Sequence, residues 1–422
     1  MTSRLLAAAT VVAAGCGGTD EPEPCDPTMV GNICTVAGSG ESGYGGDDGP
    51  ALEAAMSLPQ DTLHGSDGTM FILDWNNHRI RMLVADGTMR HLAGRGELGG
   101  TLDDPANDDF NHPTSMTFDP TGTRLIVAAW HNSKLRTIDV ASGAVVDTCG
   151  DGRRAYFGDG GPAVAATLDL PASVAYAPNG DLVIMDQANQ VLRAIDGSGA
   201  IRRIAGECVI DAAPPSGPGA CAVGVEPIAW PQPLSGKTTC GAVSTCGMPC
   251  TPGYGGDDGP ALELRMSQPF GQSADPGGRI VFDAAGNLFF ADPVNALIRK
   301  IDTAGTVTRF AGSAPVAGVA QSGYAGDGGP ALAARFDNPV DLALGSDGTM
   351  YVSDVYNHCV RAIAADGTVS TAAGVCGDSG YDGDGGPAGA AQLKRPYGVE
   401  VSGDFLYVAD TGNNVVRAVR LR

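Results

Sequence analysis

The sequence predicts an all-β protein, a six-bladed β-propeller of four-stranded antiparallel blades, and three observations lead to this prediction. Two short motifs each recur six times along the chain. Asp-Gly and Asn-Gly dipeptides, which favour tight hairpin turns, separate short apolar runs between the motifs. The composition of 62 glycines, 28 prolines and only 18% charged residues favours many short strands over helices.

The first motif is Asp-x-x-Asn, followed four residues later by arginine. It begins at Asp74, Asp186, Asp292, Asp354 and Asp410, and a sixth copy has Ala129 in place of the aspartate. The second motif is a small residue followed by glycine, at Gly38, Gly94, Gly150, Gly206, Gly312 and Gly374. Six copies of each motif predict six structural units, because one closed array of repeats forms a single large domain.

Each unit contains the pattern of a four-stranded meander. In the first unit, apolar runs at 57–65, 70–75, 79–84 and 89–94 are separated by turn residues that include Asp67-Gly68 and Asp86-Gly87. Both dipeptides tolerate positive φ and therefore suit hairpins. Six such meanders arranged around a centre make a propeller.

The order of the motifs predicts how the ring closes. The first small-residue–glycine motif precedes every Asp-x-x-Asn motif, and no fourth strand follows the last of these at Asp410. Residues 32–38 are therefore expected to form the outer strand of the last blade. This pairing of the N-terminal strand with the last blade removes exposed strand edges.

The repeated segments resemble those of bacterial NHL-repeat proteins and of the NHL propeller of teneurins. The segments in question are "TVAG", "GYGGDDGPALE" and endings such as "DTGNNVVR". The resemblance covers residues 32–422 apart from one insertion, and it implies the propeller fold. It leaves the function open, because such propellers include binding modules and enzymes alike.

The N-terminal residues predict export. Residues 1–15 have the pattern of a signal peptide, with one arginine before an apolar run that is too short to span a bilayer. The sequence "AAGC" resembles a lipobox, which implies acylation of Cys16, and residues 16–31 form an acidic flexible tether. We expect an outer-membrane-anchored lipoprotein; secretion, or a periplasmic location, with a free Cys16 is the alternative.

Ten further cysteines in an exported protein predict disulfide bonds. Five of them lie in a Cys- and Pro-rich insertion at about 207–252, which we expect to be a loop tied by disulfides. A zinc site formed by Cys240, Cys246 and Cys250 is an alternative for part of this segment. Trp230 is a candidate aromatic anchor for a partner, or a tryptophan that packs locally.

The glycine- and aspartate-rich loops, such as "GYGGDDGPALE" at Gly43 and Gly253, connect one unit to the next. We expect the glycines to supply positive φ and the aspartates to cap a short helical turn that starts after proline. The alternative is an acidic collar that binds calcium. Its ligands would be Asp47, Asp48, Asp159, Asp257, Asp258, Asp327 and Asp384.

Candidate site residues lie where the inner strands begin, two residues after a proline. These positions hold Asp61, Ser115, Ser173, Gly271, Asp341 and Gly398. Inner strands line the centre of a propeller, so Asp61 and Asp341 are expected to face it, with Gln60 and Tyr397 beside them. The two carboxylates could bind a metal ion such as calcium or a basic ligand, or they could be solvated at a pore mouth.

The formal charge of −22 excludes nucleic acid as a partner, since phosphate binding needs clustered lysine and arginine. We predict a non-catalytic protein that recognises a protein or glycan in the cell envelope through its loop-rich face, and that contacts the membrane through a lipid on Cys16. The alternative is a calcium-dependent enzyme using Asp61 and Asp341. It follows from the resemblance, because similar six-bladed propellers include metal-dependent lactonases and a peptide-amidating lyase with metals on the central axis.

Overall fold

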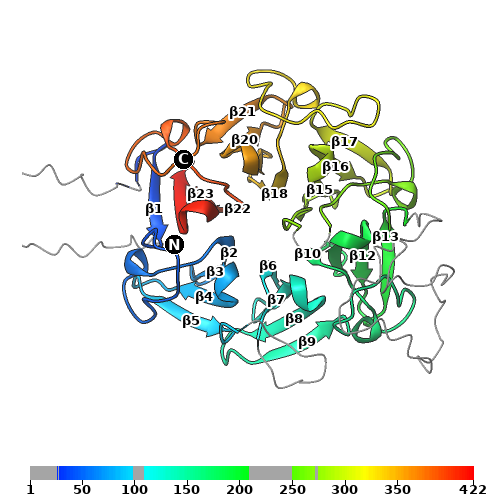
Figure 1. Ribbon diagram of the computed structural model, residues 1–422, viewed down its shortest axis with the longest axis horizontal. Coiled ribbons are helices and arrows are strands. Elements are labelled where there is room, and N and C mark those ends of the chain that lie inside the picture. Colours follow the sequence, from blue (N-terminus) through cyan, green and yellow to red (C-terminus); the bar gives the residue numbers. More distant parts are fainter. Residues whose placement is uncertain (1–25, 27, 98–108, 209–249, 271–273) are drawn as a thin grey trace, which may run out of the picture.

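The computed structural model describes residues 26, 28–97, 109–208, 250–270 and 274–422. Strands β1 to β24 in these residues form six four-stranded antiparallel sheets, which are arranged as blades around a common centre (Figure 1). The predicted fold class, blade number and strand number per blade are confirmed.

The first three blades follow the chain in order from the inner to the outer strand. Blade 1 consists of β2 (Pro59–His64), β3 (Met70–Asp74), β4 (Arg79–Leu83) and β5 (Met89–Ala93). Blade 2 consists of β6 (Pro113–Phe118), β7 (Arg124–Ala129), β8 (Lys134–Asp139) and β9 (Val145–Cys149). Blade 3 consists of β10 (Pro171–Tyr176), β11 (Leu182–Asp186), β12 (Val191–Ile195) and β13 (Ile201–Ala205).

The other three blades repeat this order, except at the closure. Blade 4 consists of β14 (Ile280–Phe282), β15 (Leu288–Asp292), β16 (Leu297–Ile301) and β17 (Val307–Ala311). Blade 5 consists of β18 (Pro339–Leu344), β19 (Met350–Asp354), β20 (Cys359–Ile363) and β21 (Val369–Ala373). Blade 6 consists of β22 (Gly398–Ser402), β23 (Phe405–Asp410), β24 (Val415–Arg420) and β1 (Ile33–Ala37).

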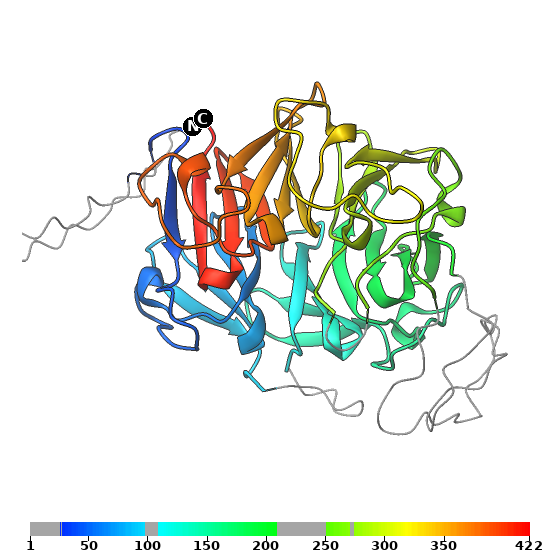
Figure 2. The same ribbon diagram turned by 45° about the horizontal axis from the view of Figure 1, so that its top comes forward.

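The ring closes as predicted. Strand β1 pairs antiparallel with β24, with Cys34 opposite Ala418 and Ala37 opposite Val416. The two strands come from opposite ends of the chain and lie side by side in the structure (Figures 1 and 2). Hydrogen bonds to β24 therefore satisfy one edge of the N-terminal strand, which would otherwise be open.

The hydrophobic core lies between neighbouring blades. Side chains of β3, such as Phe71 and Leu73, pack against Met116 and Val127 of blade 2, and all four are buried. Equivalent clusters fill the other interfaces between blades. The packing fixes each sheet against the next, so that loops on one side of the ring hold fixed relative positions.

The six turns between the second and third strands mark one side of the ring, which we call the turn face. Each is a single 3₁₀ turn: Trp75–Asn77, Trp130–Asn132, Gln187–Asn189, Pro293–Asn295, Val355–Asn357 and Thr411–Asn413. The asparagine of the motif bonds the glycine-rich connector in five blades, for example Asn77 Nδ2 to the Gly43 carbonyl at 2.6 Å. The connectors and these turns therefore meet on the same side, as the strand order predicts.

Disulfide bonds are present, as expected for an exported chain. Cys208 is bonded to Cys250, which joins the two ends of the predicted insertion, and Cys359 is bonded to Cys376. Cys34 is also disulfide-bonded. The zinc alternative that used Cys250 is wrong, because this sulfur is already committed to a disulfide.

Cys149 corrects the expectation that the ten cysteines form disulfides, because it is a free thiol. It replaces the alanine of the small-residue–glycine motif and is completely buried. Burial raises its pKa to about 12, so the thiol is neutral and serves as a small core side chain.

The Cys359–Cys376 disulfide predicts a measurable contribution to stability. We expect the double variant Cys359→Ala/Cys376→Ala to lose about 3 kcal/mol of unfolding free energy, because the bond closes a short loop in the unfolded chain. Urea titration monitored by circular dichroism measures this loss. Cys149→Ala is the matched control and should cost less than about 1 kcal/mol, since alanine occupies this position in other blades. Equal losses in the two variants would contradict the prediction.

Candidate functional site: the turn face and the centre of the ring

Each Asp-x-x-Asn motif belongs to a buried ionic module, and blade 3 shows its construction. The Arg193 side chain, which projects from β12, is completely buried. It pairs with Asp186 at 3.2 Å and with Asp159 of the connector at 2.8 Å. The Tyr156 ring lies 5.2 Å from its guanidinium carbon, and Asn189 bonds Asp186 at 2.8 Å. Coulomb attraction and hydrogen bonds together compensate the desolvation of the arginine.

The same module recurs in four other blades. Its arginine and its two aspartates are Arg81 with Asp74 and Asp47, Arg299 with Asp292 and Asp257, Arg361 with Asp354 and Asp327, and Arg417 with Asp410 and Asp384. Blade 2, which has Ala129 in place of the motif aspartate, pairs Arg136 with Asp147 of β9 at 2.9 Å instead. The aspartate and arginine of the motif therefore serve the architecture of each of these five blades.

These contacts give five of the connector aspartates a different role, as partners of the buried arginines. The glycines do adopt positive φ: Gly46 has φ of 79°, and a Cβ there would lie 2.6 Å from the Ala54 Cα. The predicted cap is wrong, since the 3₁₀ turns after the prolines receive no side-chain cap. Asp47 instead faces Arg81, so a guanidinium lies where the acidic collar would hold a cation.

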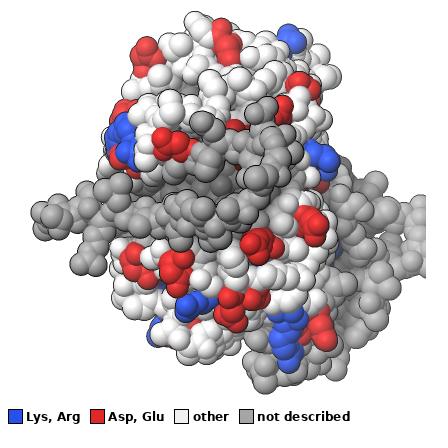
Figure 3. All heavy atoms as spheres, turned by 90° about the vertical axis from the view of Figure 1, so that its left-hand side faces the viewer, with Lys and Arg blue, Asp and Glu red and all other residues white. Residues whose placement is uncertain are grey.

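Acidic side chains are also spread over the outer surface of the ring. On the side where blades 1 and 6 meet, many acidic groups lie among few basic ones (Figure 3). The excess of acidic side chains agrees with the formal charge of −22.

At the centre of the ring, the structure brings Asp61 and Asp341 together with a residue that sequence analysis missed. Arg279 Nη1 lies 2.7 Å from Asp61 Oδ2 and 3.5 Å from Asp341 Oδ2. Both carboxylates are 6% exposed, so the alternative of solvated carboxylates at a pore mouth is wrong. Arg279 also donates to the Gln60 carbonyl at 3.1 Å and to the Thr114 carbonyl.

Arg279, not Gly271, occupies the inner-strand entry of blade 4. Ile280 pairs with Phe290 in the register in which Leu342 pairs with Val352 in blade 5, so Arg279 is the equivalent of Asp341. Proline spacing pointed to Gly271 because additional residues follow Pro269 before β14 begins. The signal that could have located Arg279 is the apolar run "IVF" that directly follows it and carries the strand pattern.

The entry side chains of blades 1, 3 and 5 each accept a hydrogen bond from the following blade. Asp61 Oδ2 accepts the Met116 amide at 3.2 Å, and Ser173 Oγ accepts the Ile280 amide at 3.1 Å. Asp341 Oδ2 likewise accepts the Val399 amide at 2.9 Å. The polar groups at the centre therefore form hydrogen bonds and ion pairs that hold the inner strands together.

Tyr397 lies apart from this central cluster, on the turn face. Its hydroxyl accepts a 2.8 Å hydrogen bond from Arg395, which also pairs with Asp275 at 3.2 Å. Asp275 accepts a further hydrogen bond from the Tyr356 hydroxyl. Burial raises the pKa of Tyr397, so its hydroxyl stays protonated. The predicted site residues Trp230 and Cys16 lie outside the described residues.

Three histidines that sequence analysis did not group meet at the seam between blades 1 and 2. His112 Nδ1 lies 2.9 Å from His131 Nδ1, and the His112 amide donates to His78 Nδ1 at 3.2 Å. Trp75 and Trp130 pack against His112 and His131. The three residues come from separate segments, so no spacing in the sequence indicates the cluster.

Within the described part of the chain, no three His, Cys, Asp or Glu residues are grouped so that they could hold a metal ion. Calcium binding stays a prediction from the sequence. The same residues contain no helix that is long and apolar enough to cross a membrane.

The histidine cluster predicts a loss of stability in acid. Burial lowers the pKa of His112 to about 3 and the pKa of His131 to about 4. Both histidines are neutral in the folded protein and take up protons near pH 6.5 in the unfolded chain. Their contribution to the free energy of unfolding is therefore fully present above about pH 6.5 and falls as the pH decreases toward 4. We expect protonation of these histidines in the unfolded chain to lower the free energy of unfolding by about 2–3 kcal/mol over this pH range, after allowance for partial exposure.

The measurement is the free energy of unfolding by urea at several pH values. His112→Asn should reduce the decrease in unfolding free energy below about pH 6.5. Asparagine suits the positive φ of 55° at this position. The exposed His91→Asn is the control and should leave the slope unchanged. Comparing slopes cancels the opposite contribution of the buried aspartates. Parallel curves for wild type and His112→Asn would contradict the prediction.

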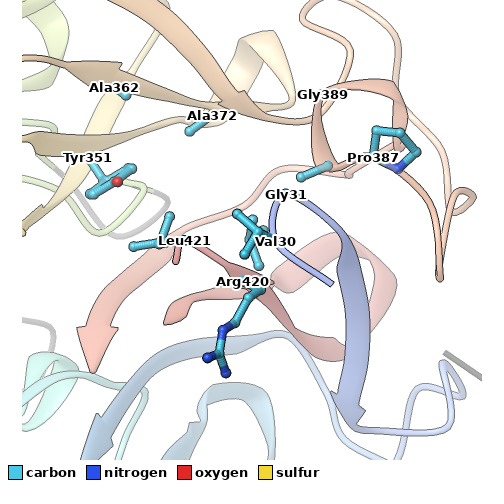
Figure 4. Close-up of a pocket in the computed structure, with 11 residues that line it drawn as sticks. Val30, Gly31, Tyr351, Ala362, Ala372, Pro387, Gly389, Arg420 and Leu421 are labelled. Carbon is cyan, nitrogen blue, oxygen red and sulfur yellow. The ribbon is translucent and has the colours of Figure 1, made fainter. Parts of the chain in front are cut away.

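Among the hollows in the described part of the chain, two lie between blades. The first, of about 300 Å³, lies between blades 5 and 6, and Tyr351, Val30 and Leu421 line it with small side chains such as Ala362 and Ala372 (Figure 4). Its lining carries one charged side chain, Arg420, which points away from the apolar groups (Figure 4).

The second hollow, of about 370 Å³, lies between blades 4 and 5 on the turn face. Its lining is mixed: Pro269, Asp275, Pro293, Val294, Ala320, Ser322, Asp337, Asn338 and Tyr356. Asp275 and Tyr356 bond each other in this lining, whereas Asn338 Nδ2 is buried without a hydrogen-bond partner. This second hollow, which we call the blade 4–5 pocket, is the candidate binding site.

Comparison with known proteins agrees with the fold. The model for the NHL repeat matches residues 336–363. Teneurin-1 of Gallus gallus is 24% identical over 405 residues, which cover 88% of this chain and 13% of that protein. Protein SUPPRESSOR OF QUENCHING 1, chloroplastic, of Arabidopsis thaliana is 26% identical over 340 residues, covering 78% of this chain and 27% of that protein.

The chain therefore spans about a quarter or less of the length of these two relatives. Among solved structures, an auxiliary nutrient binding protein from Bacteroides thetaiotaomicron has a TM-score of 0.58 at 13% identity, covering 92% of this chain and 75% of that one. At this identity the likeness concerns the fold alone. The repeated motifs, the closed ring and these matches agree: the chain is a six-bladed β-propeller, and residues 336–363 match the NHL repeat.

Proposed function

We propose that this protein is a non-catalytic recognition protein of the cell envelope, which binds a protein or glycan through its turn face. The observation that carries the proposal is the pairing of Arg279 with Asp61 and Asp341. In this pairing the two central carboxylates stabilise the contact between blades. A rigid ring with varied loops on one side suits recognition without catalysis.

The blade 4–5 pocket supplies the polar and apolar groups that recognition requires. Val294 and Tyr356 in its lining are 50% and 43% exposed, and the neighbouring Phe270 is 43% exposed. Exposed apolar side chains beside unpaired polar groups are typical of a binding surface. The solved protein of similar fold that is named an auxiliary nutrient binding protein supports a binding function at the level of fold alone.

Export and anchoring complete the proposal. The disulfides indicate an exported protein, because such bonds persist in oxidising compartments. A lipid on Cys16 would hold the protein at the outer membrane, with residues 16–31 as the tether. The turn face would then be available to partners in the envelope.

A quantitative capture experiment tests the proposal. Immobilised wild-type protein is incubated with detergent-solubilised envelope proteins and, separately, with a glycan array, and retained ligands are quantified. Tyr356→Ala is expected to reduce specific binding, whereas Val146→Ala on the rim strand β9, 59% exposed, is the control that should not. Equal binding by both variants would remove the turn face from the proposal.

The enzyme alternative is tested on the same protein by elemental analysis and by assays with lactone substrates. A stoichiometric metal ion that is lost in Asp61→Ala together with lactone hydrolysis would overturn the proposal. Full ligand capture by protein treated with a chelator would support it.

A further inference from the structure

The Asp337 carboxylate lines the blade 4–5 pocket, and it is a half-buried charge without a counter-ion among the described residues. No hydrogen bond or ion pair joins this carboxylate to another described side chain, and burial raises its pKa. Ser322, on the connector that leads into blade 5, belongs to the same lining. A carboxylate taken partly out of water without a counter-ion costs stability, and a cation beside it would offset that cost.

Blade 3 contains the counter-ion that blade 5 lacks. Asp169 and Asp337 occupy equivalent positions, because the amide of each donates to the motif aspartate of its own blade, at 2.8 and 2.7 Å. Arg154 occupies the connector position of blade 3 that Ser322 occupies in blade 5, since in both blades the motif asparagine bonds the next carbonyl along the connector. The Arg154 guanidinium pairs with Asp169 at 2.6 Å. Serine at this position therefore leaves Asp337 without the arginine that blade 3 supplies.

Blade 1 shows a neutral arrangement of the same two positions. Ser57 stands where Asp337 stands in blade 5, and its hydroxyl oxygen lies 3.3 Å from that of Ser42, the equivalent of Ser322. Blade 1 thus pairs two neutral groups and blade 3 pairs opposite charges. Blade 5 combines the aspartate of blade 3 with the serine of blade 1, so the carboxylate at its pocket is left for a cation from outside the chain.

The remaining lining suits an arginine side chain. Tyr356 and Val294 are exposed there and offer apolar surface to a methylene stem. Asp275 is a second carboxylate of the lining, but Arg395 already pairs with it at 3.2 Å, so Asp337 carries the uncompensated charge. The volume of about 370 Å³ lies in the range of ligand pockets. A free acceptor beside apolar walls fits a guanidinium, which only donates hydrogen bonds.

We propose that the blade 4–5 pocket binds an arginine side chain of a partner protein, whose guanidinium pairs with Asp337 as Arg154 pairs with Asp169. The inference rests on the proposed recognition function and names the chemistry of the partner. The formal charge of −22 also attracts a basic partner. A metal ion fits the pocket less well, because no three His, Cys, Asp or Glu side chains of the described chain are grouped to hold one.

The test is a titration of the full chain, followed by saturation-transfer-difference NMR, with a short acetylated and amidated peptide that has one arginine between glycines. The same peptide with citrulline is the control ligand, because citrulline keeps the shape of arginine and loses the charge. We expect the arginine peptide to bind saturably, and Asp337→Asn to weaken its binding about tenfold. Glu41→Gln removes an exposed charge outside the pocket and should leave the affinity unchanged.

A second variant fills the pocket from within. Ser322→Arg restores the arrangement of blade 3, so its own guanidinium should pair with Asp337 and weaken peptide binding at least tenfold. Circular dichroism and thermal melting check independently that each variant is folded. The proposal is overturned if the arginine peptide does not bind saturably or if the citrulline peptide binds equally well. It is also overturned if Asp337→Asn and Ser322→Arg bind the arginine peptide as wild type does.

The two proposals fail in distinguishable ways. If Tyr356→Ala abolishes capture of an envelope protein or glycan while Asp337→Asn captures it as wild type does, the recognition function stands and the arginine inference fails. If neither variant changes capture and the arginine peptide does not bind, both fail.

Discussion

Replacing Arg279 by methionine is expected to lower the free energy of unfolding by about 3–5 kcal/mol near pH 8. The substitution removes the cation that lies between Asp61 and Asp341, and it leaves two carboxylates that are each 6% exposed. An uncompensated charge in a buried position is among the costliest changes a single mutation can make. Urea titration of the variant and wild type at fixed pH measures the difference.

The loss should depend on pH in a defined direction. Burial raises the pKa of Asp61 to about 7 and raises the pKa of Asp341, while Arg279 opposes both shifts. A carboxyl whose folded pKa is raised penalises the folded state progressively as pH increases from about 4 through that folded pKa. Without Arg279 the pKa values rise further, so the deficit of the variant should be small near pH 5 and large near pH 8.

A triple variant separates the charge effect from lost packing. Arg279→Met combined with Asp61→Asn and Asp341→Asn removes all three charges, and it should recover most of the stability near pH 8. Replacement of a complete buried ionic group is far less costly than removal of one partner. A deficit in Arg279→Met that is the same near pH 5 and pH 8 would show that the central charges do not act as a pair.

Arg193→Met is the second prediction with a large effect, and we expect it also to cost about 3–5 kcal/mol. Asp186 is completely buried beside Arg193, and Asp159 of the connector loses its partner in the same variant. Two backbone carbonyls, of Thr167 and Phe157, also lose hydrogen bonds from the guanidinium. Thermal and urea unfolding measure the change.

Arg202→Met is the matched control in the same blade. Arg202 pairs with Asp181 at 2.5 Å, but the arginine side chain is 46% exposed. Exposed pairs contribute about 0–1 kcal/mol, because water screens the charges. If both variants lost the same stability, the buried module would have no special role in the fold.

The sequence predicted the fold well because the repeated features are local. A turn that needs positive φ, a proline that begins a short 3₁₀ turn, and alternating apolar runs act over a few neighbouring residues. The closure by residues 32–38 followed from counting, since one outer strand was missing after Asp410, and it is confirmed by the pairing of β1 with β24.

The candidate site was predicted less completely. Asp61 and Asp341 do lie at the centre, but Arg279 escaped notice because additional residues displace it from the proline that usually precedes an entry position. Asp337 carries no motif of its own. It is informative only because Asp169 has Arg154 as a partner in blade 3, whereas the equivalent aspartate in blade 5 has none among the described residues.

Local sequence by itself therefore determined the blades, their number, their order and the closure of the ring. Only the tertiary structure decided which charges neutralise one another, as between Arg279 of blade 4, Asp61 of blade 1 and Asp341 of blade 5. It likewise decided which groups remain unpaired beside the pocket. The physical reason is that backbone turns depend on neighbouring residues, whereas ion pairing and burial depend on side chains that the closed ring brings together from distant positions.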